Sequence, residues 1–130
     1  MMKRHTAREK ALQALFQMDM SQLSGQEALT NVTEESEMDD YLSKLVLQTE
    51  TNLEVIDQKI RENLEKWSFE RLAKVDRSIL RLTVCEMMFI EDVPNKVAIN
   101  EAIELAKTFG DDQSSKFINA VLSKVQLSLS

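Results

Sequence analysis

Residues 75–90 read VDRSILRLTVCEMMFI, and this stretch decides the fold. Apolar side chains fall on nearly every side of it, namely Val75, Ile79, Leu80, Leu82, Val84, Met87, Met88, Phe89 and Ile90. A helix that is apolar all round is a buried one, so we predict a central helix over 75–90, ended by Pro94. A strand is the competing interpretation for part of the run, but its length favours a helix.

The segments on either side of this stretch carry apolar residues at steps of three or four, the spacing of amphipathic helices. The spacing predicts helices over about 7–20, 36–50 and 53–67, the last carrying Trp67 on its apolar stripe. A short helix is expected near 25–32, after the break at Ser24-Gly25. The polar stretch 33–40 is expected to be a loop.

Capping residues indicate where the helices begin and end. Thr6-Ala7-Arg8-Glu9 has the form of a capping box for the first helix. Ser68 is expected to cap a turn at 69–73, and Asn100 a helix that ends at Gly110. The last helix is expected to begin at Asp111, Asp112 or Ser114.

The composition supports a helical chain. The 130 residues are 43% apolar and 29% charged, and Gly and Pro together number three. That leaves few turn and strand formers, so we predict an all-α fold of six or seven helices packed as bundles, forming one domain over 1–130.

Several classes of function are disfavoured by the residues present. The single cysteine, Cys85, lies among apolar residues and is expected to be a buried structural residue. The one histidine, His5, is expected in a frayed terminus, where no catalytic triad can form. Acidic pairs such as Asp39-Asp40 and Asp111-Asp112 are expected to be solvated or to cap helices. We therefore expect no enzyme activity, no metal and no cofactor.

The lengths of the apolar segments bear on where in the cell the protein is expected. The apolar runs are shorter than the roughly 20 residues that span a bilayer. The basic N-terminus is followed by no apolar segment of the kind found in signal peptides. We expect a cytoplasmic protein without a membrane partner.

The charge is unevenly distributed although the net charge is −6. Residues 1–10 carry four basic residues against one acidic, whereas 25–65 carry eleven acidic residues against three basic. Charges farther apart than about 8 Å are largely screened at physiological salt, so a basic end can act apart from an acidic face. The distribution allows RNA binding at the N-terminus.

Two segments offer RNA-binding chemistry. Lys3, Arg4, Arg8 and Lys10 can pair with phosphates. A hundred residues later, Phe109 and Phe117 flank a polar loop, and aromatic rings beside amide and basic groups suit unpaired bases. We predict that folding brings these two ends of the chain together into one RNA site. Phe117 also fits the apolar stripe of its helix, so a role in the core is the alternative.

Three blocks of this sequence resemble the NusB family. They are Arg8–Phe16 (REKALQALF), Asp76–Leu82 (DRSILRL) with Glu86-Met87, and a C-terminal signature made of Val93-Pro94, Val97–Lys107 (VAINEAIELAK), Phe109-Gly110 and Lys116–Leu122 (KFINAVL). The blocks occur in order and cover both ends of the chain, while the acidic middle is unmatched.

The resemblance implies an all-α fold of two small helical bundles. It also implies a transcription antitermination factor that binds the boxA element of nascent RNA together with NusE, a ribosomal small-subunit protein, and joins RNA polymerase on ribosomal RNA operons. The residues that match RNA-binding positions are Lys3, Arg4, Arg8, Gln113, Lys116 and Phe117. Phe16 and Asp76 match positions that meet NusE, with Phe16 where some members carry Tyr.

The sequence departs from the family pattern at two places. The N-terminal arm has fewer arginines than in some relatives, and Gln113 stands where others have an acidic residue. One alternative is an RNA-binding domain of the kind fused to ribosomal-RNA cytosine methyltransferases. The other is a helical protein-binding adaptor that does not bind RNA, which the acidic composition slightly favours.

Overall fold

The computed structural model describes residues 2–34 and 37–130. Within these two ranges the chain forms seven α-helices, one short 3-10 helix and no strand. The elements are α1 (Arg4–Ser21), α2 (Gly25–Val32), α3 (Asp40–Thr51), α4 (Leu53–Glu62), η2 (Phe69–Arg71), α5 (Lys74–Phe89), α6 (Asn95–Phe109) and α7 (Ser114–Leu129). The predicted all-α fold is confirmed.

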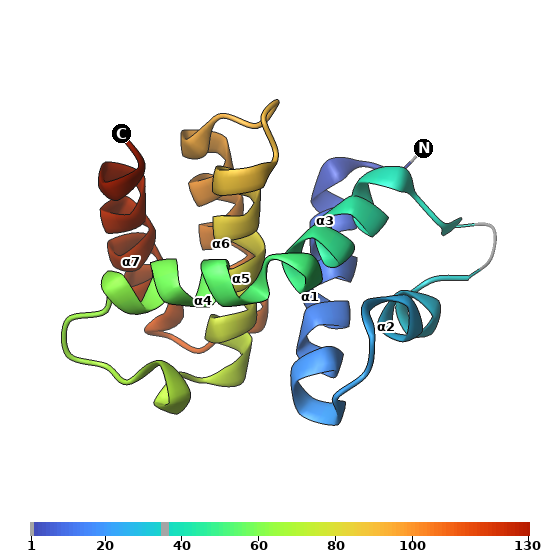
Figure 1. Ribbon diagram of the computed structural model, residues 1–130, viewed down its shortest axis with the longest axis horizontal. Helices are drawn as coiled ribbons and strands as arrows, with labels where there is room; N and C mark the ends of the chain where they lie inside the picture. The colour runs from blue at the N-terminus through green and yellow to red at the C-terminus, as the bar shows by residue number, and fades with distance from the viewer. Residues whose placement is uncertain (1, 35–36) are drawn as a thin grey trace.

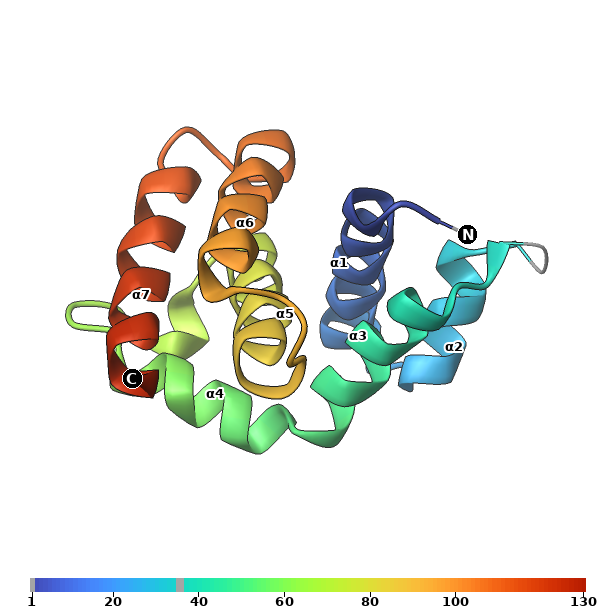
Figure 2. The same cartoon turned by 90° about the horizontal axis from the view of Figure 1, so that it is seen from above.

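The helices are arranged in two bundles. Helices α1, α2 and α3 pack together on one side, and α4 to α7 pack together on the other, as Figures 1 and 2 show. Helix α5 contacts α1 and α3 as well as its own bundle. The expectation of two small packed bundles is therefore confirmed, and α5 is the element that joins them.

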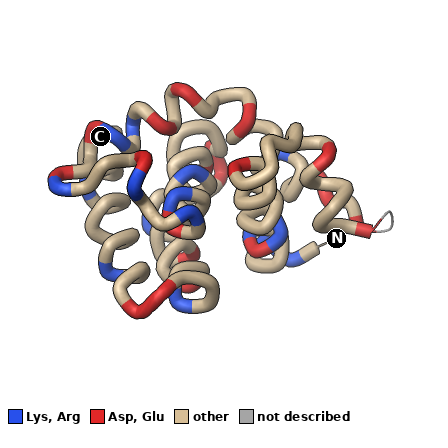
Figure 3. The backbone as a smooth tube through the Cα atoms, turned by 90° about the horizontal axis from the view of Figure 1, so that it is seen from below, with Lys and Arg blue, Asp and Glu red and all other residues tan. Residues whose placement is uncertain are grey.

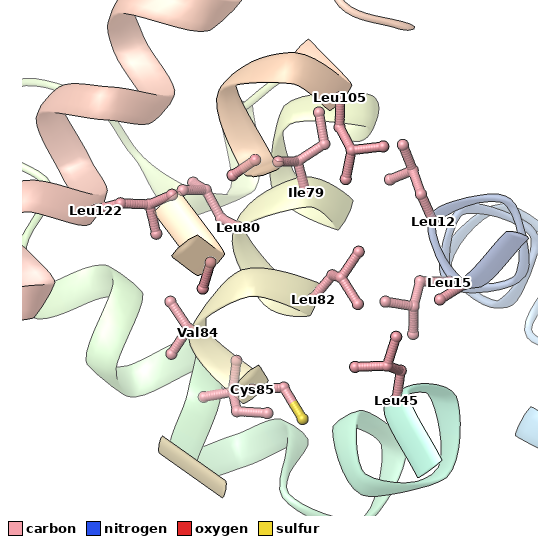
Figure 4. Close-up of a cluster of buried hydrophobic side chains, with 14 of the residues drawn as sticks. Leu12, Leu15, Leu45, Ile79, Leu80, Leu82, Val84, Cys85, Leu105 and Leu122 are labelled. Carbon is pink, nitrogen blue, oxygen red and sulfur yellow. The ribbon is translucent and has the colours of Figure 1, made fainter. Parts of the chain in front are cut away.

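The core surrounds α5, as residues 75–90 predict. Ile79, Leu80, Leu82 and Val84 are all fully buried. In Figure 4, Leu82 points toward Leu15 and Leu45 of the first bundle, while Leu80 points toward Leu122 of α7. Because side chains leave α5 in opposite directions into both bundles, no whole face of this helix is exposed to solvent, and the strand interpretation is wrong.

A network of ion pairs holds α1 and α4 against α5. The Arg77 guanidinium donates to the Asp19 carboxylate at 2.7 Å, and that of Arg81 donates to both oxygens of Asp57 at 2.8 Å. The Phe69 ring lies beneath the Arg77 and Arg81 guanidinium groups. Burial alone would raise the pKa of Asp19, but the hydrogen bond from Arg77 and the positive charges of Arg77 and Arg81 together outweigh it and lower the pKa.

Two predicted helix starts are wrong. Helix α1 begins at Arg4 with Lys3 as its N-cap, so Thr6 lies inside the first turn instead of capping it. Helix α6 begins at Asn95, and Asn100 lies within it. Pro94 supplies the fixed φ of −60° that suits a helix entrance, and its carbonyl accepts from Val97 and Ala98 at 3.0 and 3.1 Å.

Helix α4 ends earlier than predicted, at Glu62. The Asn63 side-chain amide donates to the Lys59 carbonyl at 2.9 Å and so satisfies a free C-terminal group of the helix. Trp67 consequently lies outside the helix and is 62% exposed, so its predicted place on a buried stripe is wrong.

The start of α7 at Ser114 agrees with the prediction, whereas Ser68 precedes η2 without the side-chain capping hydrogen bond that was predicted. A capping box does occur at α2, where Ser24 and Glu27 exchange hydrogen bonds, and Asp39 accepts from the first backbone amides of α3. Helix α3 itself begins at Asp40, so the start predicted near 36 is wrong, and part of the predicted loop over 33–40 lies outside the described residues. Helix α6 ends before Gly110, where an added Cβ would lie 2.5 Å from the Ser114 side chain.

Candidate functional site

The N-terminal cations lie at the start of α1, beside the loop between α5 and α6. Lys3 and Arg4 are exposed. The Arg4 guanidinium donates to the Asp92 carboxylate at 2.8 Å and lies 4.3 Å from the centre of the Tyr41 ring. The hydrogen bond from Arg4 lowers the pKa of Asp92. Because an exposed ion pair is weak, Arg4 can exchange Asp92 for a phosphate at little cost.

Arg8 does not share this exposed position. It is 3% exposed, and its guanidinium donates to both oxygens of Glu86 on α5 at 2.9 to 3.1 Å. A second carboxylate, that of Glu101 on α6, lies 3.3 Å away. Burial opposes the charge, but the hydrogen bond to Glu86 together with the attraction of Glu86 and Glu101 outweighs it and raises the pKa of Arg8. Its predicted direct contact with RNA does not fit this burial.

The buried Glu86 also binds the third helix of the first bundle. The Tyr41 hydroxyl donates to Glu86 Oε2 at 2.5 Å, and burial together with this bond raises the pKa of Tyr41. The ring of Tyr41 is in turn covered by Arg4. Arg8 and Glu86 therefore set the position of the surface on which Arg4 lies.

His5 and Lys10 also contact other residues of the protein. His5 lies within helix α1, and its Nδ1 atom is 3.2 Å from the Glu101 carboxylate of α6. The expectation that His5 lies in a frayed terminus is therefore wrong. Lys10 donates to the Val32 carbonyl at 3.2 Å and lies 3.9 Å from Glu37. Figure 3 shows Lys and Arg on both bundles, interspersed with Asp and Glu.

The second set of predicted RNA-binding residues lies at the start of α7. Gln113 and Lys116 are exposed, and Phe117 is half-buried. The Phe117 ring meets the Trp67 ring edge to face, with centroids 6.4 Å apart and planes at 78°. The Asp111 carboxylate accepts from the Gln113 backbone at 2.9 Å, which closes a turn before α7; the N-cap of that helix is Gln113, whose side chain makes no capping hydrogen bond.

The two sets are not brought together, so the predicted single site made from both ends of the chain is wrong. Arg4 pairs with Asp92, just before α6, whereas Gln113 follows the opposite end of α6. Helix α6 has 15 residues, and at 1.5 Å per residue it is about 22 Å long. A bound strand would have to run along the molecule to reach both sets.

The two predicted partner-binding residues, in contrast, line the same hollow. Phe16 of α1 and Asp76 of α5 line one hollow of about 360 Å³ together with Phe109, Gly110 and Ser114. A neighbouring hollow of about 370 Å³ shares Phe16 and Phe109 with it. The side chain of Phe109 was expected beside the RNA, but it is 37% exposed in this hollow.

Asp76 is an unusual residue within the hollow. It is 8% exposed, and its buried Oδ1 atom has no hydrogen-bond partner among the described residues. Burial raises the pKa of Asp76, the Ser114 side chain opposes that shift, and the nearby Asp111 carboxylate adds to it. A buried carboxylate oxygen without a donor is costly, so this position suits a donor brought by another molecule.

Catalytic and metal-binding chemistry finds little support. Among residues 2–34 and 37–130, no three His, Cys, Asp or Glu side chains are grouped to hold a metal ion. Cys85 is fully buried, and burial raises the pKa of its thiol to about 11, which keeps it protonated at neutral pH. None of the helices in the described ranges is long and apolar enough to cross a membrane.

Two features of the site were missed from the sequence. The exposure of Trp67 beside Phe117 was hidden by its spacing, which continues the stripe of α4. The roles of Tyr41 and Glu86 depend on contacts between residues 45 positions apart. The available signal was Glu86, an acidic residue among the apolar residues of the run 75–90, since a buried charge requires a partner.

Known proteins resemble this chain over nearly its full length. The NusB family model matches residues 5–127. The transcription antitermination protein NusB of Geobacillus kaustophilus is 53% identical over 128 residues, covering 98% of each chain. That of Bacillus mycoides is also 53% identical, over 127 residues, covering 96% of this chain and 98% of its own.

Solved structures agree with these matches. NusB of T. maritima has a TM-score of 0.87 at 35% identity, covering 95% of this chain and 90% of its own. A chain from a crystal structure of the antitermination factors NusB and NusE in complex with double-stranded RNA has a TM-score of 0.86 at 30% identity, covering 98% and 99%. Sequence, fold and both sets of comparisons thus lead to one conclusion: the chain belongs to the NusB family.

Proposed function

We propose that this protein is a cytoplasmic transcription antitermination factor that acts by binding and not by catalysis. It binds boxA-type single-stranded RNA together with NusE, and the complex joins the RNA polymerase elongation complex on ribosomal RNA operons. The observation that carries the proposal is the hollow at Phe16 and Asp76, which has the chemistry of a docking site. Relatives that bear the name of antitermination proteins, and a structural neighbour solved with NusE and RNA, support it.

The partner surface combines an apolar wall with one unsatisfied acceptor. Phe16 and Phe109 line the hollow together with Asp76, whose Oδ1 atom is the unsatisfied acceptor. A ribosomal protein is rich in cations, and a Lys or Arg side chain placed here would satisfy Asp76. Aromatic anchors around a desolvated polar contact are typical of the residues that carry interface affinity.

The RNA surface consists of two separated parts. Lys3 and Arg4 offer cations for phosphates at one end, and Gln113, Lys116 and Phe117 offer amide, charge and ring at the other. Phosphate contacts position a strand and base contacts give specificity, so the two parts should fail differently when altered. Arg8 contributes by holding α1 against Glu86, not by touching RNA.

Binding measurements with RNA, alone and with NusE, test the proposal. Asp76→Lys should weaken NusE binding far more than it weakens RNA binding by the protein alone. Glu54→Lys makes the same charge reversal at an exposed site on α4 and should leave both affinities near wild type. Retained NusE affinity in Asp76→Lys would contradict the partner assignment.

The RNA part has its own test. Replacing both Lys3 and Arg4 with Ala should weaken binding to every single-stranded RNA and reduce the salt slope by about one to two units. Unchanged RNA affinity at all salt concentrations would favour a helical adaptor that binds protein alone. Tight binding to ribosomal RNA without any preference for boxA would favour the role of a methyltransferase-type RNA domain.

A further inference from the structure

Trp67 is the one tryptophan of the chain, and it lies on the surface between α4 and η2. Its side chain is 62% exposed, although a large aromatic side chain gains more than most from burial. Asn63 ends α4 before Trp67 is reached, so the helical stripe does not carry the indole into the core. The fold therefore holds an aromatic surface in water at this loop.

The surroundings of Trp67 form a small aromatic and basic recess. A hollow of about 250 Å³ lies between the loop and α7, lined by Trp67, Phe117, Lys66, Lys124 and Leu64 among others. The Phe117 ring stands at 78° to the indole, so the two rings form a corner instead of a closed stack. Because 62% of the Trp67 side chain is exposed, the indole is accessible to a flat ligand.

The charges around the recess favour a polyanion. Lys66 is exposed, and Lys116 is exposed on the turn of α7 that carries Phe117. The Lys124 ammonium lies 2.5 Å from Glu65, and the side chain of Lys124 is half-buried while that of Glu65 is largely exposed, so this pair can open toward a phosphate. Stacking platforms beside cations are the pattern by which proteins bind unpaired bases.

We propose that Trp67 is an additional RNA-binding residue, which stacks on an unpaired base of the strand whose neighbouring contacts are Lys116 and Phe117. The proposal rests on the RNA-binding function proposed above and extends it from α7 to the α4–η2 loop. The contact discriminates single-stranded from duplex RNA, because a paired base cannot expose its face to the indole. It is tolerant of base identity, since every base has a π-face.

The position of Trp67 allows its RNA role to be separated from a structural one. Being 62% exposed, it buries little apolar area, so Trp67→Ala should leave the unfolding midpoint near that of wild type. The affinity for a short unstructured RNA oligonucleotide should fall about 5-fold to 150-fold, the range measured for loss of one base stack. Trp67→Phe keeps an aromatic face and should retain most of the affinity.

The indole provides a direct readout, because no second tryptophan contributes emission. Titration of the wild-type protein with the single-stranded oligonucleotide should quench the fluorescence with the same midpoint as binding. The duplex of that oligonucleotide should quench much less at equal occupancy. Val97→Ala, which trims an exposed apolar side chain on α6, is the control and should bind as wild type does.

The outcomes distinguish this inference from the function on which it rests. If the wild-type protein binds the oligonucleotide without quenching, and Trp67→Ala binds equally well, Trp67 does not stack and the inference is overturned. If quenching occurs with NusE alone and not with RNA, the surface is a protein interface, which also overturns it. If the wild-type protein binds no RNA with or without NusE, the proposed function itself fails.

Discussion

Replacing Glu86 with Gln should lower the free energy of unfolding by about 3–5 kcal/mol, the usual cost of removing one partner of a buried ion pair. Glu86 is 1% exposed and accepts from Arg8 at 2.9, 3.1 and 2.9 Å and from the Tyr41 hydroxyl at 2.5 Å. Glutamine keeps the size of the side chain but removes its charge. It also turns an amide donor toward groups that are themselves donors.

The surroundings of Arg8 narrow the range expected for the loss in free energy of unfolding. After the substitution, Arg8 keeps the Glu101 carboxylate at 3.3 Å, and that carboxylate is 25% exposed. Partial compensation places the expected loss near the lower end, at about 3 kcal/mol. Tyr41→Phe removes one hydrogen bond to a charged acceptor and should cost less, about 1.5–3 kcal/mol. Replacing the whole group (Arg8→Met, Glu86→Leu and Tyr41→Phe together) should recover much of the loss, because no buried charge remains.

Urea unfolding followed by circular dichroism measures these changes. With slopes of about 1–3 kcal/mol per molar urea, a loss of about 3 kcal/mol moves the midpoint by roughly 1–3 M. Glu54→Gln, the same change at an exposed position, should alter stability by less than about 0.5 kcal/mol. A loss below about 1 kcal/mol for Glu86→Gln at unchanged slope would refute the reasoning. So would a triple variant no more stable than the single one.

Three further predictions concern single residues of α5. Ile79→Ala should cost about 2–5 kcal/mol in the same urea assay because Ile79 is fully buried, and a change of a few tenths would place it at the surface. Cys85, buried and with a thiol pKa of about 11, should react with a thiol reagent at pH 8 only as fast as the protein unfolds, so rapid labelling of the native protein would contradict its burial. Asp76 has a raised pKa, so the native state binds its proton more tightly than the unfolded state and the stability of the wild type falls as pH rises through that interval. Asp76→Asn should therefore be at least as stable as wild type at pH 7, and its advantage in stability should shrink toward pH 3. The same variant should lose NusE affinity. A large loss of stability at pH 7 would mean that Asp76 is structural.

Local patterns were sufficient for most of the fold. The apolar run 75–90 predicted the central helix because burial on all sides leaves no polar face, and the structure confirms it. The ends at Gly25 and Gly110 were also predictable from residues next to them in the chain. The sequence predicted Pro94 only as the end of the helix over 75–90, whereas in the structure it is also the N-cap of α6 in place of Asn100.

The candidate site was predictable only as a set of residue types. The resemblance to the NusB family named Phe16 and Asp76, and the structure adds that they share a hollow with Phe109. The resemblance also named Arg8 among the RNA-binding residues, yet Arg8 is buried against Glu86, 78 positions away. Nothing in the sequence around Arg8 separates it from the exposed Arg4.

The sequence by itself determined the helices, because the period of apolar residues and the chemistry of helix ends act over a few neighbouring positions. Only the tertiary structure decided which charges are buried in pairs, which acceptor is left unpaired at Asp76, and which aromatic ring faces water at Trp67. The physical reason is that solvation and hydrogen bonding of a side chain depend on atoms from distant segments that packing brings into contact. Helix α5 shows both sides of this division, since its apolar pattern predicts its burial, while α1, α3 and α4 supply the partners of its charges.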